Sequence, residues 1–294
     1  MTRRGVREFL ATKTMRVAVY FVNSLVFLMI IGLLLKSRPI LEQHTLWEML
    51  SSDTWRPLRG QFGFFPFIVG TIEITLLSMA LAVPPCLLAA IYLAEFARPR
   101  VRDALRVVID LMAGIPSVVY GLFGVIIIVP MVREFGLLLG RHTTGYSLLA
   151  GGIILAIMVV PIITSVTTEV LLTVPVEARE STMALGATRW ETVKHVVLKQ
   201  GRQGVISAIV LGFARAFGET IAVMMVVGNV AKLPHSVFDP AYPLPALIAN
   251  NYGEVMSIPL YDSALLFAAL ILLVVVGGFH LAAHLTLTRL RRGE

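Results

Sequence analysis

The stretch VAVYFVNSLVFLMIIGLLL, residues 17–35, contains 19 consecutive residues and no charged side chain. A helix of about 20 mostly apolar residues crosses the core of a bilayer, so this stretch is predicted to span a membrane. The composition extends that interpretation to the whole chain, because 57% of its 294 residues are hydrophobic and only 15% are charged. Soluble domains carry about 25% charged residues. The sequence therefore predicts an all-α membrane protein.

Five further apolar segments predict five further transmembrane helices, which gives six in all. They cover residues 67–93, 107–129, 148–168, 204–230 and 264–287. Pro84-Pro85 is expected to kink the second of the six spans. The chain is predicted to begin with a basic N-terminus (residues 1–16), followed by a first helix with an outer loop (17–66). A five-helix core that includes the loop 169–203 then covers residues 67–287, and residues 288–294 form a short tail.

Lys and Arg are distributed unequally between the connecting segments. The segments 1–16, 94–106, 169–203 and 288–294 contain 17 of the 25 Lys and Arg residues. The segments on the opposite side contain 7, and Arg215 lies within a span. Because cytoplasmic loops are enriched in Lys and Arg, both ends of the chain are predicted to be cytoplasmic. The same distribution explains the net charge of +7 without a nucleic-acid partner, and residues 1–35 are interpreted as an uncleaved signal anchor.

The segment between the fourth and fifth predicted spans contains VPVEARESTMALGATRWE, residues 174–191. A proline and acidic residues near the start of this stretch are typical of a helix N-terminus. Gly186 stands where a helix would end or turn. The sequence therefore predicts a short helix, a turn at Gly186 and a second short helix on the cytoplasmic face.

Two charged residues, Arg215 and Glu219, lie inside the predicted span 204–230. Their spacing of four places them on one face of a helix. At about 1.5 Å per residue, Arg215 lies roughly 16 Å into a core that is ~30 Å thick. The planar fork of arginine matches an oxyanion, so this pair is interpreted as a site for an anionic substrate. A structural ion pair that locks two helices is the alternative.

Other polar residues in the spans support weaker interpretations. Glu73 is compatible with a role in an outer vestibule and equally with an interhelical hydrogen bond. Asp110 follows Arg106 by four residues, which predicts an ion pair at the cytoplasmic boundary. His280 and His284 have a metal-compatible spacing, but the sequence offers no third ligand. No metal site and no cofactor are therefore predicted.

The cytoplasmic loop resembles the "EAA" loop of ABC importer permeases. The resemblance rests on Glu180-Ser181-Thr182, Gly186 and Val196-Val197-Leu198. The chain departs from the pattern where Ser-Thr replaces Ala-Ala and where Lys199 replaces a proline. In that family the loop forms a coupling helix that docks on the ATP-hydrolysing subunit. The resemblance implies this role for Glu180, Ser181, Ala184, Leu185, Gly186 and Ala187, whereas an ordinary interfacial amphipathic helix is the alternative.

Three further stretches resemble phosphate ABC importer permeases of the PstC type. They are FARAFGETIAV with the following Gly228-Asn229, GIPSVVYG (residues 114–121) and GFFPFIVGT (residues 63–71). The resemblance implies a type I ABC importer permease in the inner membrane that carries inorganic phosphate. The implied partners are a paralogous PstA-type permease, a dimer of ATP-binding subunits, an extracytoplasmic phosphate-binding protein and membrane lipid. The implied pathway residues are Arg215 and Glu219, with Ser117, Tyr120, Thr220 and Asn229 as neutral donors.

Other functions find less support in the sequence. The chain has no Gly-x-x-x-x-Gly-Lys-Ser/Thr loop, so another subunit must hydrolyse the ATP, and no catalytic residue is predicted. The motifs His-Glu-x-x-His and Gly-x-Ser-x-Gly are also missing, which argues against the commonest intramembrane enzymes. A secondary transporter would leave the cytoplasmic loop unexplained. Within ABC importers, a permease for sulfate or molybdate and a PstA-type subunit remain as alternatives.

Overall fold

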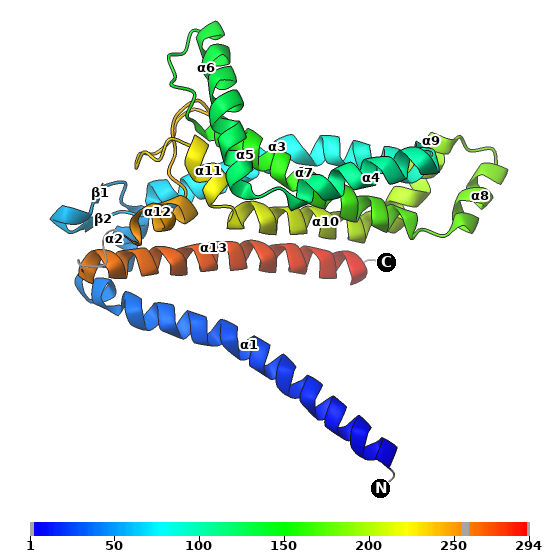
Figure 1. The fold of residues 1–294 in the computed structure, drawn as a ribbon, viewed down its shortest axis with the longest axis horizontal. Coiled ribbons are helices and arrows are strands. Elements are labelled where there is room, and N and C mark those ends of the chain that lie inside the picture. Colours follow the sequence, from blue (N-terminus) through cyan, green and yellow to red (C-terminus); the bar gives the residue numbers. More distant parts are fainter. Residues whose placement is uncertain (1–2, 254–258, 293–294) are drawn as a thin grey trace.

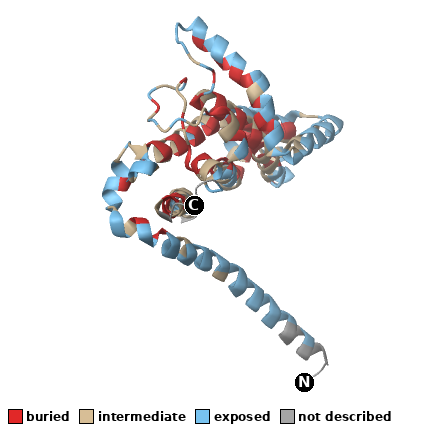
Figure 2. Cartoon of the chain, turned by 60° about the vertical axis from the view of Figure 1, so that its left-hand side comes forward, coloured by how far each residue is buried: buried red, intermediate tan, exposed pale blue. Residues whose placement is uncertain are grey.

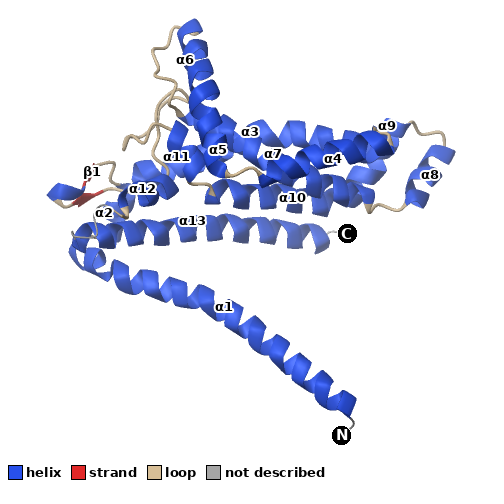
Figure 3. Cartoon of the chain, viewed as in Figure 1, coloured by secondary structure: helices blue, strands red, loops and turns tan. Residues whose placement is uncertain are grey.

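The computed structural model of the chain describes residues 3–253 and 259–292, which are mostly helical (Figures 1 and 3). Its long helices are α1 (Arg3–Gln43), α3 (Phe65–Ile91), α7 (Leu148–Leu172), α10 (Leu198–Gly218) and α13 (Pro259–Arg292). The helices α3, α7, α10 and α13 run side by side along the long axis of the molecule (Figure 1). Helix α1 packs against α13 near one end and then diverges from the bundle.

Shorter elements cap and connect this bundle. The helices are α2 (Leu46–Ser51), α4 (Pro99–Gly114), α5 (Ser117–Phe123), α6 (Val129–Leu138), α8 (Val176–Ala184), α9 (Arg189–Thr192), α11 (Ile221–Val226) and α12 (Leu244–Asn251). A small antiparallel hairpin joins β1 (Trp55–Arg56) to β2 (Gln61–Phe62) across the short 3₁₀ turn Pro57–Arg59. Three π-helical segments, Tyr92–Phe96, Gly124–Ile128 and Val193–Val197, continue neighbouring α-helices.

Five helices in the described residues are long and apolar enough to cross a membrane. They cover Ala11–Gln43, Phe65–Phe96, Ser117–Leu138, Leu148–Leu172 and Leu260–Thr286. The first, second and fourth predicted spans lie within these helices, and the sixth does so except for its last residue; all four are confirmed as apolar membrane-length helices. Helix α3 continues through Pro84 and Pro85. The all-α membrane fold is therefore confirmed, but the prediction of six uninterrupted spans is not.

The third predicted span, residues 107–129, is wrong in its boundaries. Helix α4 ends at Gly114, and Ile115 and Pro116 have extended backbones, with ψ angles of 128° and 142°. Proline disfavours a helical conformation in the residue before it, so the chain breaks here and α5 starts at Ser117. The apolar membrane-length helix then runs from Ser117 to Leu138.

The fifth predicted span, residues 204–230, is also interrupted. Helix α10 ends at Gly218, Glu219 has an extended backbone (φ −78°, ψ 125°), and α11 begins at Ile221. Oε1 of Glu219 accepts a hydrogen bond from the amide of Ala222 at 3.4 Å. This carboxylate therefore satisfies one of the free amides at the start of α11, and the break divides the predicted span into two helices.

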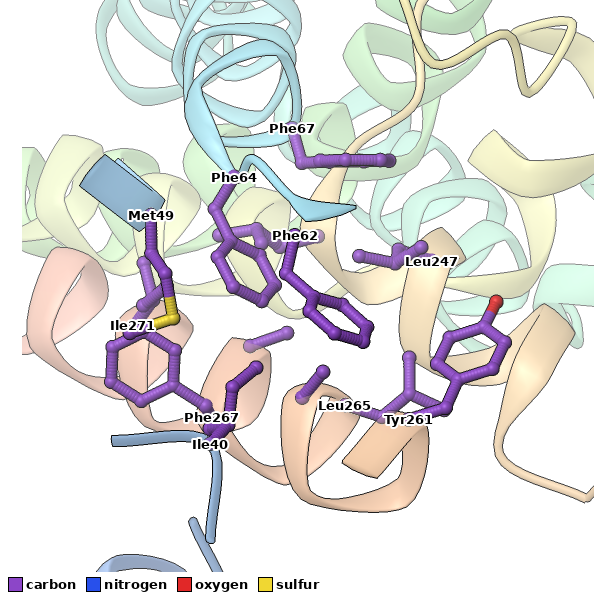
Figure 4. Close-up of a cluster of buried hydrophobic side chains, with 13 residues drawn as sticks. Ile40, Met49, Phe62, Phe64, Phe67, Leu247, Tyr261, Leu265, Phe267 and Ile271 are labelled. Atoms are coloured by element: carbon purple, nitrogen blue, oxygen red, sulfur yellow. The ribbon is translucent and has the colours of Figure 1, made fainter. Parts of the chain in front are cut away.

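The largest cluster of buried aromatic residues lies at the end of the bundle opposite α8. It joins α1, α2, α3, α12 and α13 through the side chains labelled in Figure 4. Trp55 of the hairpin contacts Phe62, Phe64, Phe67 and Tyr261 edge to face, with ring centroids 5.0–5.9 Å apart. Buried residues gather in the bundle, whereas α1 is exposed along most of its length (Figure 2). Apolar side chains on an exposed membrane-length helix are suited to lipid.

Glycine allows the segment after α5 to pack tightly against α7 and α11. A Cβ atom on Gly124 would lie 2.6 Å from Cγ1 of Val226 and 2.8 Å from Cγ1 of Ile154. Both of these neighbours belong to the buried core. The absence of a side chain at Gly124 therefore sets the distance between these helices.

We expect Gly124→Ala to destabilise the protein. The added methyl group overpacks the contact with Val226 and Ile154, at a cost of about 1–3 kcal/mol. Gly277→Ala is the matched control, because a Cβ atom there meets nothing within 4 Å. Thermal unfolding in detergent should show a lower Tm for Gly124→Ala than for Gly277→Ala, and equal Tm values would contradict the proposed close packing.

Candidate functional site

Arg215 lies in the last turn of α10, and Glu219 lies in the break between α10 and α11. Nη2 of Arg215, in the last turn of α10, lies 3.9 Å from Oε2 of Glu219. That distance is too long for a good hydrogen bond, so the attraction between the two groups is mainly coulombic. The Arg215 side chain is 46% exposed, whereas that of Glu219 is 7% exposed. Glu219 is thus held in place and the Arg215 guanidinium faces open space.

The open space beside Arg215 is a groove between α4, α7 and α10. Its volume is about 510 Å³, and Asp110, Pro161, Ser165 and Arg215 contribute to its lining. Arg215 and Glu219 lie near each other, as their spacing of four predicts, although α10 ends one residue before Glu219. Glu219 is the residue that directly follows α10, and the Arg215 side chain lines the groove.

Tyr120 of α5 is buried close to this pair. Its hydroxyl donates a hydrogen bond to the Met112 carbonyl of α4 at 2.8 Å and lies within electrostatic range of Arg215. A Cβ atom on Gly121 would lie 3.2 Å from the Ala222 Cα atom, so α5 and α11 approach each other closely here. The structure therefore brings together three of the six predicted pathway residues: Arg215, Glu219 and Tyr120.

The other three predicted pathway residues have different surroundings. Ser117 is half-buried at the first position of α5, and Thr220 lies between α10 and α11. Asn229 lies beyond the other end of α11, with a positive φ of 51°. Its Nδ2 donates to the Met224 carbonyl at 2.8 Å, whereas its buried Oδ1 has no hydrogen-bond partner in the described part of the chain. Asn229 is therefore separated from Arg215 by the length of α11.

The predicted helix–turn–helix in the loop 169–203 is confirmed by α8, α9 and the turn between them. Gly186 has a φ of +90°, which residues with side chains rarely adopt. Thr188 and Glu191 form a capping box at the start of α9. The hydrogen bonds from the side chain and backbone of Thr188 lower the pKa of Glu191. The second helical stretch does not end as a separate short helix, because it continues through the π-helical segment Val193–Val197 into α10.

Helix α8 projects from one end of the bundle and contains no buried residue (Figure 1). The predicted coupling residues are exposed except Ala187, which is half-buried; they are Glu180, Ser181, Ala184, Leu185, Gly186 and Ala187. Leu185 is 89% exposed, and Met183 and Trp190 are exposed near it. Exposed apolar patches rimmed by polar residues mark sites of protein–protein contact, which fits a docking surface at this end.

Sequence reasoning missed the ion pair that fastens α8 to the bundle. Nη2 of Arg179 lies 2.8 Å from Oε1 of Glu95, and Nε lies 3.1 Å from the same oxygen. Arg179 also donates to the carbonyls of Leu171 and Val174. Arg189 donates to the carbonyl of Glu95. In the sequence, Arg179 stands out only because it precedes Glu180 in the loop that resembles the EAA loop. No sequence pattern relates Arg179 to Glu95, which is 84 positions away.

Two other predicted polar residues are placed as follows. Asp110 does not pair with Arg106 as predicted, because Nη2 of Arg106 lies 2.7 Å from Oε1 of Glu169 on the neighbouring helix α7. Glu73 and His235 line a pocket of about 320 Å³ on the side of the bundle away from α8. This position is compatible with the outer-vestibule interpretation of Glu73.

The chain is similar in sequence to known membrane transport proteins. Residues 86–290 match the family described as binding-protein-dependent transport system inner membrane component. The chain is 40% identical to the probable ABC transporter permease protein YqgH of Bacillus subtilis over 77% of this chain and 73% of that protein. It is 38% identical to the phosphate transport system permease protein PstC of Xylella fastidiosa over 83% and 79% of the respective chains.

The fold also matches a solved structure. A chain from a bacterial alginate ABC transporter, crystallised with a periplasmic protein bound to an alginate pentasaccharide, superimposes with a TM-score of 0.61. The match covers 94% of this chain and 93% of that chain. At 17% sequence identity, it shows a shared fold, that of the type I ABC importer permeases.

We expect Glu95→Ala to release α8 from the bundle. Removing one partner of a buried ion pair leaves the other charge uncompensated, at a cost of about 3 kcal/mol or more. Limited proteolysis with trypsin should then cut faster at Arg179 and Arg189. Glu42→Ala is the matched control because it removes an exposed ion pair with Arg38 on α1. Unchanged cleavage in Glu95→Ala would show that other contacts hold α8.

Proposed function

The chain belongs to the family of binding-protein-dependent transport system inner membrane components, and we propose that it is the PstC-type permease subunit of an ATP-driven importer of inorganic phosphate. The phosphate assignment is supported by the similarity to PstC of Xylella fastidiosa. On this proposal, the chain forms the translocation pathway together with a paralogous PstA-type permease. The chain itself performs no catalysis.

The observation that carries the proposal is the open guanidinium of Arg215. Intramembrane arginines are rare and usually face a cavity or partner, and Arg215 faces a groove of about 510 Å³. Its planar fork binds tetrahedral oxyanions through paired hydrogen bonds. The buried carboxylate of Glu219 at 3.9 Å weakens the net positive field, so an anion is attracted without being held permanently. Ser117 and Thr220 are proposed neutral donors along the same route, and Asn229 is proposed to contribute nearer its outer end. Tyr120 is proposed to line the route without donating to the anion, because its hydroxyl already donates to the Met112 carbonyl.

A PstC-type permease requires partner subunits at both ends of the molecule. Helix α8 with the turn at Gly186 is proposed to dock on one of two ATP-binding subunits through Leu185 and the exposed residues around it. The opposite end of the molecule, with α12 and the β1–β2 hairpin, would then receive an extracytoplasmic phosphate-binding protein. The protein would lie in the inner membrane, with residues 67–287 as the transport core.

Both termini are proposed to be cytoplasmic. The described ends of α1 and α13 and the helix α8 lie toward the same end of the long axis (Figure 1). The segments at this end carry most of the Lys and Arg residues, as the positive-inside bias requires.

A sulfate or molybdate permease is the main alternative. The guanidinium fork of Arg215 does not by itself discriminate between tetrahedral oxyanions. The similarity to PstC proteins favours phosphate as the substrate. An uptake assay in which sulfate and unlabelled phosphate compete with labelled phosphate distinguishes these substrates.

We expect the complex of this chain with its partner permease, ATPase and binding protein to take up radiolabelled phosphate into vesicles only when ATP is present. Arg215→Gln should lower the uptake at least about tenfold, because it removes a charge-assisted hydrogen bond to the anion. Arg38→Gln, on the exposed surface of α1, is the control. Uptake without the ATPase, or stronger inhibition by sulfate than by unlabelled phosphate, would contradict the proposed function.

We expect Gly186→Asp to prevent docking of the ATPase while the chain still inserts into the membrane. The residue at position 186 has a φ of +90°, and a residue with a side chain is strained there by about 1–2 kcal/mol. The added negative charge also lies beside Leu185 on the docking surface. Co-purification of the ATPase measures docking, with Gly277→Ala as the control, and wild-type recovery would argue against this surface.

A further inference from the structure

Two grooves lie end to end along the line where α4 and α7 pack together. The first is the groove beside Arg215, and the second is lined by residues that include Arg102, Arg106, Thr168 and Glu169. Ile109 and Ser165 line both grooves. The two grooves therefore adjoin each other, and together they are here called the α4–α7 seam, which runs from Arg215 toward the end of the bundle that carries α8.

The two parts of the seam differ greatly in size. The part beside Arg215 has a volume of about 510 Å³, whereas the part beside Arg106 has about 20 Å³. A volume near 10–15 Å³ holds roughly one water molecule. The groove beside Arg215 therefore has room for a tetrahedral oxyanion, whereas the groove beside Arg106 has no room for one in this conformation.

An ion pair crosses the closed part of the seam. Nη2 of Arg106 on α4 lies 2.7 Å from Oε1 of Glu169 on α7. The two side chains are 61% and 51% exposed. Exposed pairs of this kind add little to stability, and α4 and α7 also contact each other through other residues. The pair is thus not required to hold the two helices together.

The charges along the seam suit the passage of an anion. Arg215 and then Arg106 and Arg102 offer guanidinium groups in sequence, and each has a carboxylate nearby, which for Arg102 is Asp103 at 4.0 Å. Asp110 and Glu219 lie near Arg215, and Glu169 binds Arg106. A doubly charged oxyanion offers the arginine fork the same paired oxygens as a carboxylate and carries a larger negative charge. It can therefore replace Glu169 as the partner of Arg106.

We propose that Arg106 is a second binding station for the transported oxyanion and that Glu169 is its built-in competitor. When no anion is present, the Arg106–Glu169 ion pair closes the inner end of the seam. An anion that arrives from Arg215 exchanges with the Glu169 carboxylate, and the seam opens between α4 and α7. This inference rests on the proposed function and adds an inner gate to the pathway.

The test uses the complete four-component complex in vesicles and a Ser165→Cys variant. Ser165 lines both grooves, and the natural Cys86 is buried, so a small charged thiol reagent reports mainly on position 165. Inorganic phosphate should slow the labelling. In this background, Arg106→Gln should raise the half-protecting phosphate concentration at least about tenfold, and Glu169→Gln should lower it by about threefold. Arg38→Gln should leave it unchanged.

The gate is supported if Arg106→Gln and Glu169→Gln shift the half-protecting phosphate concentration in opposite directions. If the ion pair were only structural, the loss of either partner would shift that concentration in the same direction. Shifts in one direction, or no shift, overturn it. If phosphate fails to protect the thiol introduced at position 165 in a complex that still takes up phosphate, the gate is also overturned, because the seam is then not the route. A complex that takes up no phosphate refutes the proposed function instead.

Discussion

A bilayer core offers the backbone no water, so every interruption of a helix there needs a hydrogen-bond partner from the protein itself. Two interruptions shape this chain, at residues 115–116 and at 219–220. The Tyr120 hydroxyl binds the Met112 carbonyl at the end of α4, and the Glu219 carboxylate binds the Ala222 amide at the start of α11. The residues that make these breaks tolerable are therefore also the residues that surround Arg215.

This arrangement links packing to chemistry. Gly121 and Gly124 let α5 and the segment after it lie against α11 and α7, so the two breaks are close together rather than at opposite sides of the bundle. Glu219 is fixed by its bond to the Ala222 amide and by burial. Arg215 has no comparable anchor among the described residues and keeps its guanidinium exposed. A fixed carboxylate beside a free guanidinium attracts anions and still permits their release.

Much of the fold could be predicted from hydrophobic runs, because four of the six predicted spans coincide with uninterrupted apolar helices. Gly186 was also predictable, since glycine is the residue that suits a turn with positive φ. The two helix breaks were harder to predict, because the length and hydropathy of a segment do not change when a single residue such as Glu219 has an extended backbone. Pro116 is a sequence feature that favours the other break. The ion pairs between distant segments could not be predicted, because they depend on how the helices pack and not on the local sequence pattern. These pairs are Glu95–Arg179 and Arg106–Glu169. The local i,i+4 rule favoured Asp110 as the partner of Arg106, and the neighbouring helix supplied a better one.

The π-helical segments have a consequence for how such membrane sequences are compared. A turn closed by i→i+5 bonds holds one residue more than an α-helical turn, and such turns occur at Tyr92–Phe96, Gly124–Ile128 and Val193–Val197. The face that a helix presents before such a turn is therefore out of phase with the face it presents afterwards. A single helical wheel drawn through residues 117–138 mixes two different surfaces. Each half of that helix has to be projected separately before its lipid-facing and protein-facing sides can be told apart.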